Sequence, residues 1–240
     1  MKKHAIVADS GAPAKGATHR PAKEPMQAGP HPLVGARFVI GAAEAWQLPD
    51  EGVSEIAFAG RSNAGKSSAI NALANHSRLA FSSRTPGRTQ QINVFALRGG
   101  ALVCDLPGYG YAAVAKSLKR NWQEFLWQYL TTRQNLIALV VLVDSRQGIT
   151  DLDHTVLAAF VPSGRPVLVL ATKADKLGTA AQREALRTIQ AAVQAAFPLG
   201  SPNVQVLLFS AVTRLGVAEA ERIIDGWLPP VPAVAPSPAR

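Results

Sequence analysis

A stretch of eight residues, 60–67, constrains the fold of this chain more than any other feature. Its letters, GRSNAGKS, fit the pattern G-x-x-x-x-G-K-[ST] of a phosphate-binding loop. The apolar residues 56–59 before it are typical of a short buried strand, and residues 68–74 after it are typical of a helix. This strand–loop–helix context favours a phosphate loop over the alternative, a glycine-rich turn that binds nothing.

Each residue type in this loop has a chemical reason. Two glycines let the backbone curl so that its N–H groups surround a phosphate, and the start of the following helix adds positive potential. We expect Lys66 to reach the β- and γ-phosphates of a nucleotide and to act in catalysis, and the Ser67 hydroxyl to bind Mg²⁺. The predicted nucleotide contacts here are Gly60, Arg61, Ser62, Asn63, Ala64, Gly65, Lys66, Ser67 and Ser68.

Segments typical of strands and of helices alternate through the rest of the chain. The predicted strands are residues 37–40, 56–59, 91–97, 101–104, 136–143, 166–171 and 204–209, and the predicted helices are 68–74, 117–132, 151–160, 179–197 and 213–228. Arg98-Gly99-Gly100 predicts a hairpin between the third and fourth strands. This order predicts an α/β fold, with a mostly parallel sheet, one antiparallel edge strand and helices on both faces.

Composition divides the chain into three parts and points to an anionic partner. We predict a disordered basic arm over residues 1–32, a nucleotide-binding domain over residues 33–228 and a disordered Pro/Ala-rich tail over residues 229–240. The net charge of +9 favours a nucleic-acid partner, although basic tails that only aid solubility are the alternative. The single cysteine, Cys104, lies in an apolar run and is expected to be a small buried hydrophobe. The longest apolar run, residues 136–143, is too short to span a bilayer, so we expect a soluble, cytoplasmic protein. We also expect it to be monomeric in isolation.

A second motif, Asp105-Leu106-Pro107-Gly108, follows the strand predicted at residues 101–104. In phosphate-loop proteins an Asp at such a strand end holds Mg²⁺, often through a water molecule, and we expect this of Asp105. Gly108 is expected to bring its N–H to the γ-phosphate and so to act in catalysis. Gly108 and Gly110 make this segment flexible enough to reorganise when that phosphate leaves.

Two further loops complete the predicted site. The polar segment 84–90 is expected to supply a hydroxyl to the Mg²⁺ shell, from Thr89 or, as the alternative, from Thr85. Thr172-Lys173-Ala174-Asp175 follows the strand predicted at residues 166–171. A carboxylate at Asp175 can accept hydrogen bonds from the N1–H and the amine of guanine, which adenine does not offer in that arrangement, so it would select GTP over ATP. The Lys173 stem can pack over the base, and Ser210-Ala211 can place an N–H near the guanine oxygen.

Together these motifs resemble the EngB (YihA/YsxC) family of bacterial GTPases, within the TrmE-Era-EngA-EngB-Septin-like superfamily. The resemblance covers residues 33–228, and it includes the Thr at position 172 where other GTPases carry Asn. It implies a P-loop GTPase fold, GTP binding with Mg²⁺, a role in assembly of the large (50S) ribosomal subunit, and a requirement in cell division and septation. The further site residues that it implies are Gly87, Arg88, Thr89, Gln90, Gln91, Asp105, Leu106, Pro107, Gly108, Thr172, Lys173, Ala174, Asp175, Phe209, Ser210 and Ala211.

The residue after Gly108 bears on the rate of hydrolysis. Many GTPases carry there a Gln that orients the attacking water, whereas this chain has Tyr109. We therefore expect slow intrinsic turnover, with the missing element supplied by a partner or by K⁺, which Asn63 suggests by resemblance.

Three functions remain open from the sequence. The first is an assembly GTPase that binds rRNA, through Lys116, Lys119 and Arg120 among others, unless these three form an ordinary solvated helix face. The second is a division regulator whose GTP state recruits a protein without RNA. The third, a metabolic ATP-dependent kinase, is disfavoured by Asp175.

Overall fold

The computed structural model describes residues 31–230 except residues 32, 50, 51, 81–90, 111–115 and 200, and it describes residues 116–123 and 201 by their backbone alone. The strands are β1 (Arg37–Ala42), β2 (Glu55–Gly60), β3 (Ile92–Ala96), β4 (Leu102–Asp105), β5 (Leu136–Asp144), β6 (Val167–Thr172) and β7 (Val204–Leu208). The α-helices are α1 (Lys66–Leu73), α2 (Lys116–Thr132), α3 (Asp151–Phe160), α4 (Thr179–Ala196) and α5 (Val217–Asp225).

All of these strands join one sheet in the order β1-β3-β4-β2-β5-β6-β7. β4, β2, β5, β6 and β7 are parallel neighbours, while β3 pairs antiparallel with both β1 and β4. The predicted mostly parallel sheet with an antiparallel edge is therefore confirmed, and the antiparallel edge is the pair β1–β3. The predicted hairpin is the β3–β4 connection, where Gly100 adopts φ +88°, a value that favours glycine.

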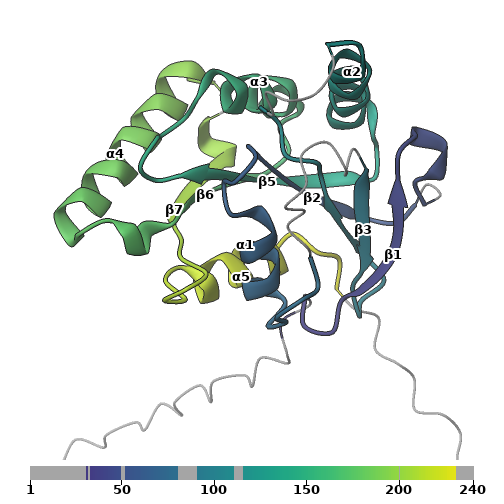
Figure 1. The fold of residues 1–240 in the computed structure, drawn as a ribbon, viewed down its shortest axis with the longest axis horizontal. Coiled ribbons are helices and arrows are strands. Elements are labelled where there is room, and N and C mark those ends of the chain that lie inside the picture. The colour runs from purple at the N-terminus through teal and green to yellow at the C-terminus, as the bar shows by residue number, and fades with distance from the viewer. Residues whose placement is uncertain are drawn as a thin grey trace, which may run out of the picture.

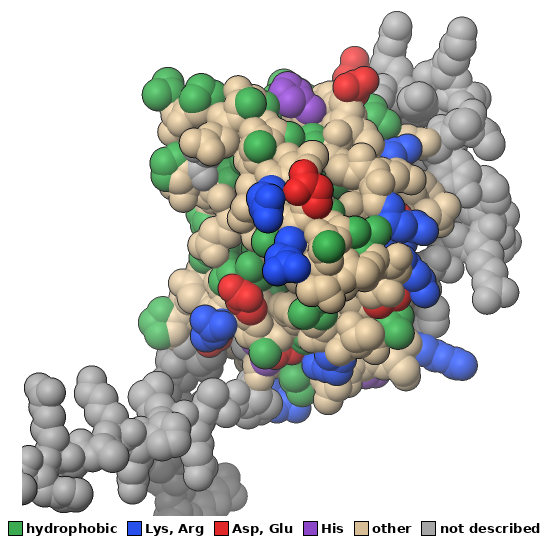
Figure 2. Space-filling model, turned by 90° about the vertical axis from the view of Figure 1, so that its left-hand side faces the viewer, with side chains coloured by type: hydrophobic (Ala, Val, Ile, Leu, Met, Phe, Trp, Pro, Cys, Tyr) green, Lys and Arg blue, Asp and Glu red, His purple; other side chains and the backbone are tan. Residues whose placement is uncertain are grey.

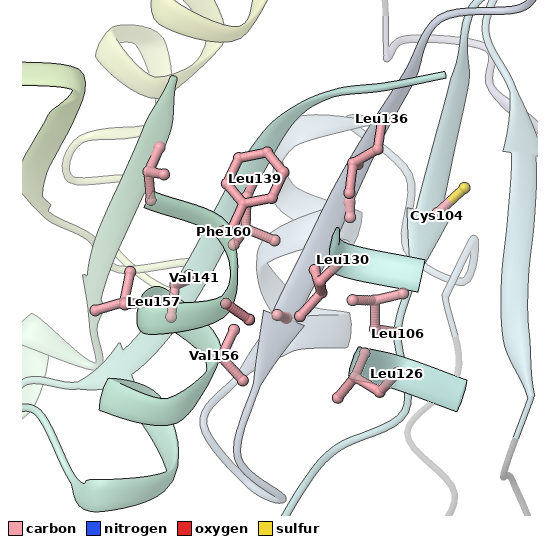
Figure 3. Close-up of a cluster of buried hydrophobic side chains, with 14 of the residues drawn as sticks. Cys104, Leu106, Leu126, Leu130, Leu136, Leu139, Val141, Val156, Leu157 and Phe160 are labelled. Atoms are coloured by element: carbon pink, nitrogen blue, oxygen red, sulfur yellow. The ribbon is translucent and has the colours of Figure 1, made fainter. Parts of the chain in front are cut away.

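Helices cover both faces of the sheet (Figure 1). α1 and α5 lie on one face, and α2, α3 and α4 lie on the other. β5 is an apolar run buried almost throughout, because it lies between β2 and β6 and under helices on both faces. Figure 3 shows side chains of α2, α3 and β5 meeting in the core, among them Leu126, Leu130, Leu139 and Phe160.

The helix predicted at residues 117–132 forms α2, and those of its expected apolar side chains that the structure describes pack into the core. Leu126 and Tyr129 are buried and Phe125 packs against the same cluster, whereas Leu118 and Trp122 lie outside the described side chains. Cys104 is completely buried, as expected, and this burial raises the pKa of its thiol.

The last helix is shorter than predicted. The sequence pattern extends over residues 213–228, whereas α5 is Val217–Asp225. Arg214 and Gly216 both have positive φ angles, 59° and 72°, which a continuous right-handed helix excludes. A Cβ at Gly216 would lie 2.1 Å from the carbonyl oxygen of Leu208, so the chain turns tightly against the end of β7 before the helix can begin.

The beginning and the end of the described chain lie on the same side of the molecule, below the sheet in Figure 1. The His31 Nε2 atom hydrogen-bonds to the carbonyl oxygen of Glu221 at 2.8 Å, and Leu33 is buried in the cluster that contains Ile224. No helix among the described residues has both the length and the apolar character needed to cross a membrane.

Candidate nucleotide-binding site

The predicted phosphate loop connects the end of β2 to the first residue of α1. Asn63 and Gly65 adopt left-handed backbone conformations, with φ angles of 65° and 94°, which curl the chain between strand and helix. A Cβ at Gly60 would lie 3.0 Å from the carbonyl oxygen of Leu142 on β5, so only glycine fits there without a shift. Ser67 and Ser68 lie in the first turn of α1, where unpaired N–H groups point out of the helix.

Lys66 forms an ion pair with Asp105, and both side chains are nearly buried. The sheet makes this contact possible, because Asp105 ends β4 directly opposite Phe58 of β2, two residues before the loop starts. The structure thus brings together a lysine and a carboxylate that are 39 residues apart in the sequence. The pair lies where phosphates and a cation are predicted to bind.

The segment after Asp105 packs against the phosphate loop. The Leu106 N–H donates to the carbonyl oxygen of Phe58 at 2.9 Å, and Leu106 and Pro107 are buried. A Cβ at Gly108 would lie 3.1 Å from Cα and 3.2 Å from N of Ser62. The backbone at Gly108 therefore lies directly against the loop, as a contact with a bound phosphate would require.

The end of β6 is tied to the phosphate loop by two side chains. The Thr172 hydroxyl lies 2.5 Å from the carbonyl oxygen of Ala64 and 3.1 Å from that of Val143, and it can donate to either. Lys173 has φ 57°, and its ammonium group donates to the carbonyl oxygen of Asn63 at 2.6 Å. The hydroxyl of Thr172 thus links the segment that is predicted to contact guanine to the phosphate loop.

The predicted guanine contacts lie together at the ends of β6 and β7. The Ser210 hydroxyl donates to Oδ1 of Asp175 at 2.7 Å, and this bond, together with the Lys176 ammonium, lowers the pKa of that carboxyl. The Ser210 oxygen in turn lies 3.2 Å from two backbone N–H groups, those of Val212 and Thr213. The N–H of Ala174 donates to the carbonyl oxygen of Phe209 at 3.2 Å, which joins the two predicted segments directly. Ala211 follows Ser210 and packs against the neighbouring core.

Part of the predicted site falls outside the described residues or away from the loop. Gly87, Arg88, Thr89 and Gln90, as well as Thr85, are not among the residues that the structure describes. Gln91 is described, and its side-chain oxygen lies 2.6 Å from the position of a Cβ on Gly41. The structure therefore places this predicted nucleotide contact beside the edge pair β1–β3.

The structure also shows site neighbours that the motifs did not indicate. Asp144, at the end of β5, pairs with Lys173 at 3.0 Å and with Arg146 at 2.7 Å. The Arg146 guanidinium lowers the pKa of the Asp144 carboxyl. The sequence signal that could have identified Asp144 is its position as a carboxylate at the carboxyl end of an apolar strand.

A cavity of about 270 Å³ lies between the phosphate loop and the β5–α3 connection. Its lining includes Ser62, Asn63, Asp144 and Lys173, together with Arg61, whose guanidinium donates to the side-chain oxygen of Gln147 at 2.8 Å. The cavity shares residues with the phosphate loop and so forms part of the same site.

Comparisons with known proteins agree with this geometry. Residues 55–173 match the family described as "50S ribosome-binding GTPase". A probable GTP-binding protein EngB from Azoarcus sp. (strain BH72) is 50% identical over 204 residues, which are 85% of this chain and 96% of that protein. A protein of the same description from Neisseria meningitidis serogroup B is 45% identical over 204 residues, with the same coverage of 85% and 96%.

Solved structures show the same fold. A probable GTP-binding protein engB superposes with a TM-score of 0.55 at 19% identity, covering 71% of this chain and 96% of that one. Era, solved with MgGDPNP and nucleotides 1506–1542 of 16S ribosomal RNA, superposes with a TM-score of 0.57 at 23% identity, covering 77% of this chain and 59% of that one. From these relatives, and with the predicted phosphate loop, Asp105 and the predicted guanine contacts in one place, this chain belongs to the EngB family of GTP-binding proteins and has the P-loop GTPase fold.

Proposed function

We propose that this protein is a cytoplasmic switch that hydrolyses GTP slowly, acts in assembly of the large (50S) ribosomal subunit, and is required for normal cell division and septation. The observation that supports the switch is that the segment carrying Asp105 and Gly108 packs against the phosphate loop that carries Lys66. The family description "50S ribosome-binding GTPase" supports the ribosomal partner.

Lys66 and Asp105 exchange partners when GTP binds, in this proposal. The lysine leaves the carboxylate for the β- and γ-phosphates, and Asp105 becomes free to face a cation. The Ser67 hydroxyl and the Asp105 carboxylate are hard oxygen ligands and fit Mg²⁺, with Thr89 as a further ligand and Asp105 acting through water. When bound, Mg²⁺ would neutralise charge that develops on the phosphates during hydrolysis.

Asp175 selects guanine in the proposed site. Its Oδ1 is fixed by Ser210 and its Oδ2 lies 3.2 Å from the Lys176 ammonium, so the carboxylate is ionised and oriented before the base arrives. An ionised carboxylate accepts the two donors of guanine and leaves adenine without a partner. Lys173 is held between Asn63 and Asp144, where its stem can cover the face of the base.

The placement of Tyr109 supports the proposal of slow turnover. The side chain is 7% exposed, and its hydroxyl donates to Asp153 at 2.7 Å. A hydroxyl committed to a buried carboxylate does not orient an attacking water. We propose that K⁺, held near Asn63, supplies part of the missing stabilisation. Equal turnover of GTP in Na⁺ and K⁺ buffers would show that this part of the proposal is wrong.

The distribution of charge favours an RNA partner that meets the loops predicted to sense the γ-phosphate. Residues 1–30 carry a net charge of +3, residues 81–90 carry +2, residues 111–120 carry +3 and residue 240 carries +1. The rest of the chain is balanced, with 14 basic and 14 acidic residues. Figure 2 agrees with this, because Lys and Arg side chains are interspersed there with Asp and Glu over the face that includes α4 and β7. The excess charge therefore lies in the arm, in the last residue and in two segments that contain or follow, along the sequence, motifs of the predicted nucleotide site, and positive charge there would attract the phosphates of RNA.

Co-sedimentation with large ribosomal subunits over a salt series tests this proposal, with GDP compared to the non-hydrolysable analogue GDPNP. We expect stronger binding with GDPNP and a loss of binding as salt rises, because RNA phosphates release counterions. Binding that ignores salt, or none in either state, would favour the division regulator that recruits a protein.

The variant Lys119→Glu/Arg120→Glu localises the contact. We expect it to weaken co-sedimentation about tenfold or more while GTP affinity stays within twofold. Arg183→Glu/Arg187→Glu makes the same change of charge on two exposed residues of α4 and is the matched control. If both double variants weaken binding equally, the first turns of α2 are not the contact.

A further inference from the structure

Tyr109 is joined to the phosphate loop through its backbone. Its carbonyl oxygen accepts the N–H of Ser62 at 2.8 Å, and its own N–H donates to the carbonyl oxygen of Gly60 at 3.3 Å. Arg61 and Tyr109 form a parallel β-bridge, a short continuation of the sheet beyond β2 and β4. The residue that follows Gly108 is thus hydrogen-bonded to the loop in both directions.

The side chain of Tyr109 is held equally firmly from another element. Its hydroxyl donates to Oδ1 of Asp153, which is 1% exposed. The other oxygen of Asp153, Oδ2, accepts the N–H of Thr150 at 3.0 Å and the Thr150 hydroxyl at 2.7 Å, in the capping box that begins α3. Burial, and next the charge of Asp153, raise the pKa of the Tyr109 hydroxyl, so it remains a proton donor at neutral pH.

These bonds restrict where the sensing loop can bend. Gly108 is bounded on one side by Leu106, whose N–H is bonded to β2, and on the other by the anchored Tyr109. The next residue, Gly110, is exposed and has φ +81°, and residues 111–115 after it lie outside the described part of the chain. The first position that can change direction without breaking the anchor is therefore Gly110 rather than Gly108.

We infer that Asp153 is a positioning residue for the γ-phosphate. Through the Tyr109 hydroxyl it holds the backbone of Gly108 against the phosphate loop before a nucleotide binds. This inference builds on the proposed contact between Gly108 and the γ-phosphate. It assigns a role in the triphosphate state to a helix cap that otherwise only starts α3.

A merely structural role for Asp153 would give a different result from a positioning role. If the carboxylate only caps α3, loss of the Tyr109 hydroxyl lowers stability and changes the affinities for GDP and for a triphosphate by the same factor. If it positions Gly108, the loss falls on the triphosphate alone, because GDP has no γ-phosphate to meet Gly108. The ratio of the two affinities separates these outcomes, and stability does not enter it.

The experiment measures dissociation constants of GDP and GDPNP for Tyr109→Phe, which keeps the ring and removes the hydroxyl. We expect GDPNP affinity to fall about 3- to 10-fold and GDP affinity to stay within twofold. Asp153→Asn should change the ratio in the same direction, and the double variant should change it no further than the larger single effect, because both remove one bond.

A matched control is offered by Tyr129, whose hydroxyl donates to the buried carboxylate of Glu55 at 2.9 Å, far from the loop. Tyr129→Phe makes the same chemical change and should leave the affinity ratio unaltered. Equal losses for both nucleotides in Tyr109→Phe, or no loss for either, overturn the inference.

Gly108→Ala separates the inference from the proposed function beneath it, because a Cβ there would press on Ser62. We expect this variant to lower GDPNP affinity more than GDP affinity. If it does so while Tyr109→Phe does not, the contact with the γ-phosphate stands and the role of Asp153 falls. If Gly108→Ala leaves the ratio unchanged, both are wrong.

Discussion

Single side chains connect the parts of this nucleotide site, and Thr172 shows how much depends on one of them. The residue is 3% exposed, and its hydroxyl lies within hydrogen-bond distance of the carbonyl oxygens of Ala64 and Val143. A contact from the base-recognising segment to the phosphate loop means that the two cannot shift independently. In the proposed site, one hydroxyl therefore couples recognition of the base to recognition of the phosphates.

Replacing this hydroxyl should cost both stability and affinity. We expect Thr172→Val, which keeps the shape, to destabilise the protein by about 1–3 kcal/mol, because a buried carbonyl loses its donor. GDP and GTP affinities should fall together. Denaturant unfolding and nucleotide titration measure the two effects, and Thr172→Ser, which retains the hydroxyl, should lose much less. A Thr172→Val protein with unchanged affinities would show that the link carries no coupling.

Asp144 gives the stability of the protein a dependence on acid pH. Its pKa is lowered in the folded state by Arg146 and Lys173, so the unfolded chain takes up a proton first as pH falls. The stabilisation is complete above the ordinary Asp pKa of about 3.9 and is lost as pH falls towards the lower folded value. The free energy of unfolding of Asp144→Asn should therefore lie below that of the unaltered protein near pH 7 and approach it below about pH 4. Asp225→Asn, which makes the same change at an exposed carboxylate, is the matched control.

At the residue scale, the motifs predicted the positions of the side chains that are expected to contact the nucleotide or Mg²⁺ directly. Lys66, Asp105, Asp175 and Ser210 all lie where the sequence pattern indicated, because their spacing from strands and helices is local. Asp153 could not be found this way. Its partner Tyr109 is 44 residues away, and only the fold brings the two together.

Among elements, α2 is fixed at the end far from the nucleotide. Arg133, just after the helix, donates from Nε to both oxygens of Glu55, at 3.1 and 3.2 Å, and from Nη2 to the carbonyl oxygen of Pro49 at 2.6 Å. Tyr129 donates to the same carboxylate. Since Glu55 begins β2, the network ties the last turn of α2 to the strand that leads into the phosphate loop. Any movement of this helix must therefore occur at its first turns.

Replacing only one partner of the Arg133–Glu55 pair should strongly lower the free energy of unfolding. Glu55 is completely buried, so Arg133→Met leaves its carboxylate bonded to the Tyr129 hydroxyl but without an opposite charge, and we expect a loss of about 3–5 kcal/mol of unfolding free energy. The double variant Arg133→Met/Glu55→Gln should recover part of this loss. Arg187→Met, which breaks the exposed pair with Glu184, should cost less than about 0.5 kcal/mol. Additive losses in the double variant would show that the pair does not act as a unit.

Element boundaries show where sequence patterns reach their limit. Periodicity predicted the existence and type of every strand and α-helix that the structure describes, because most of them bury an apolar face or run, although β1 leaves Phe38 and Val39 exposed. It extended the last helix too far towards its start, since Arg214 and Gly216 turn there against β7 through a backbone conformation that apolar spacing does not record.

The whole molecule divides, in our proposal, into a nucleotide-binding domain over residues 33–228 and basic or Pro/Ala-rich ends. A protein of residues 31–230 should bind GDP within twofold of the full chain and melt within a few degrees of it, because residues 1–30 and 231–240 contain few large apolar residues that could join a core. Its binding to ribosomal RNA should be less sensitive to salt. We expect the slope of log affinity against log salt to decrease in magnitude by about 1 to 4, since residues 1–30 hold five basic side chains. An unchanged slope would show that the arm makes no contact with RNA phosphates.

The cluster that joins Leu33 to Ile224 has a consequence for biosynthesis. A ribosome that adds about 5–20 residues each second needs about 10 to 40 s to proceed from the first of these residues to the second. During that time α5 has not been synthesised, so the apolar side chains of α1 and of the sheet face beneath it lack the helix that buries them in the finished protein. Chaperones that bind exposed apolar segments should therefore engage this protein during translation and leave it once α5 has emerged and packed.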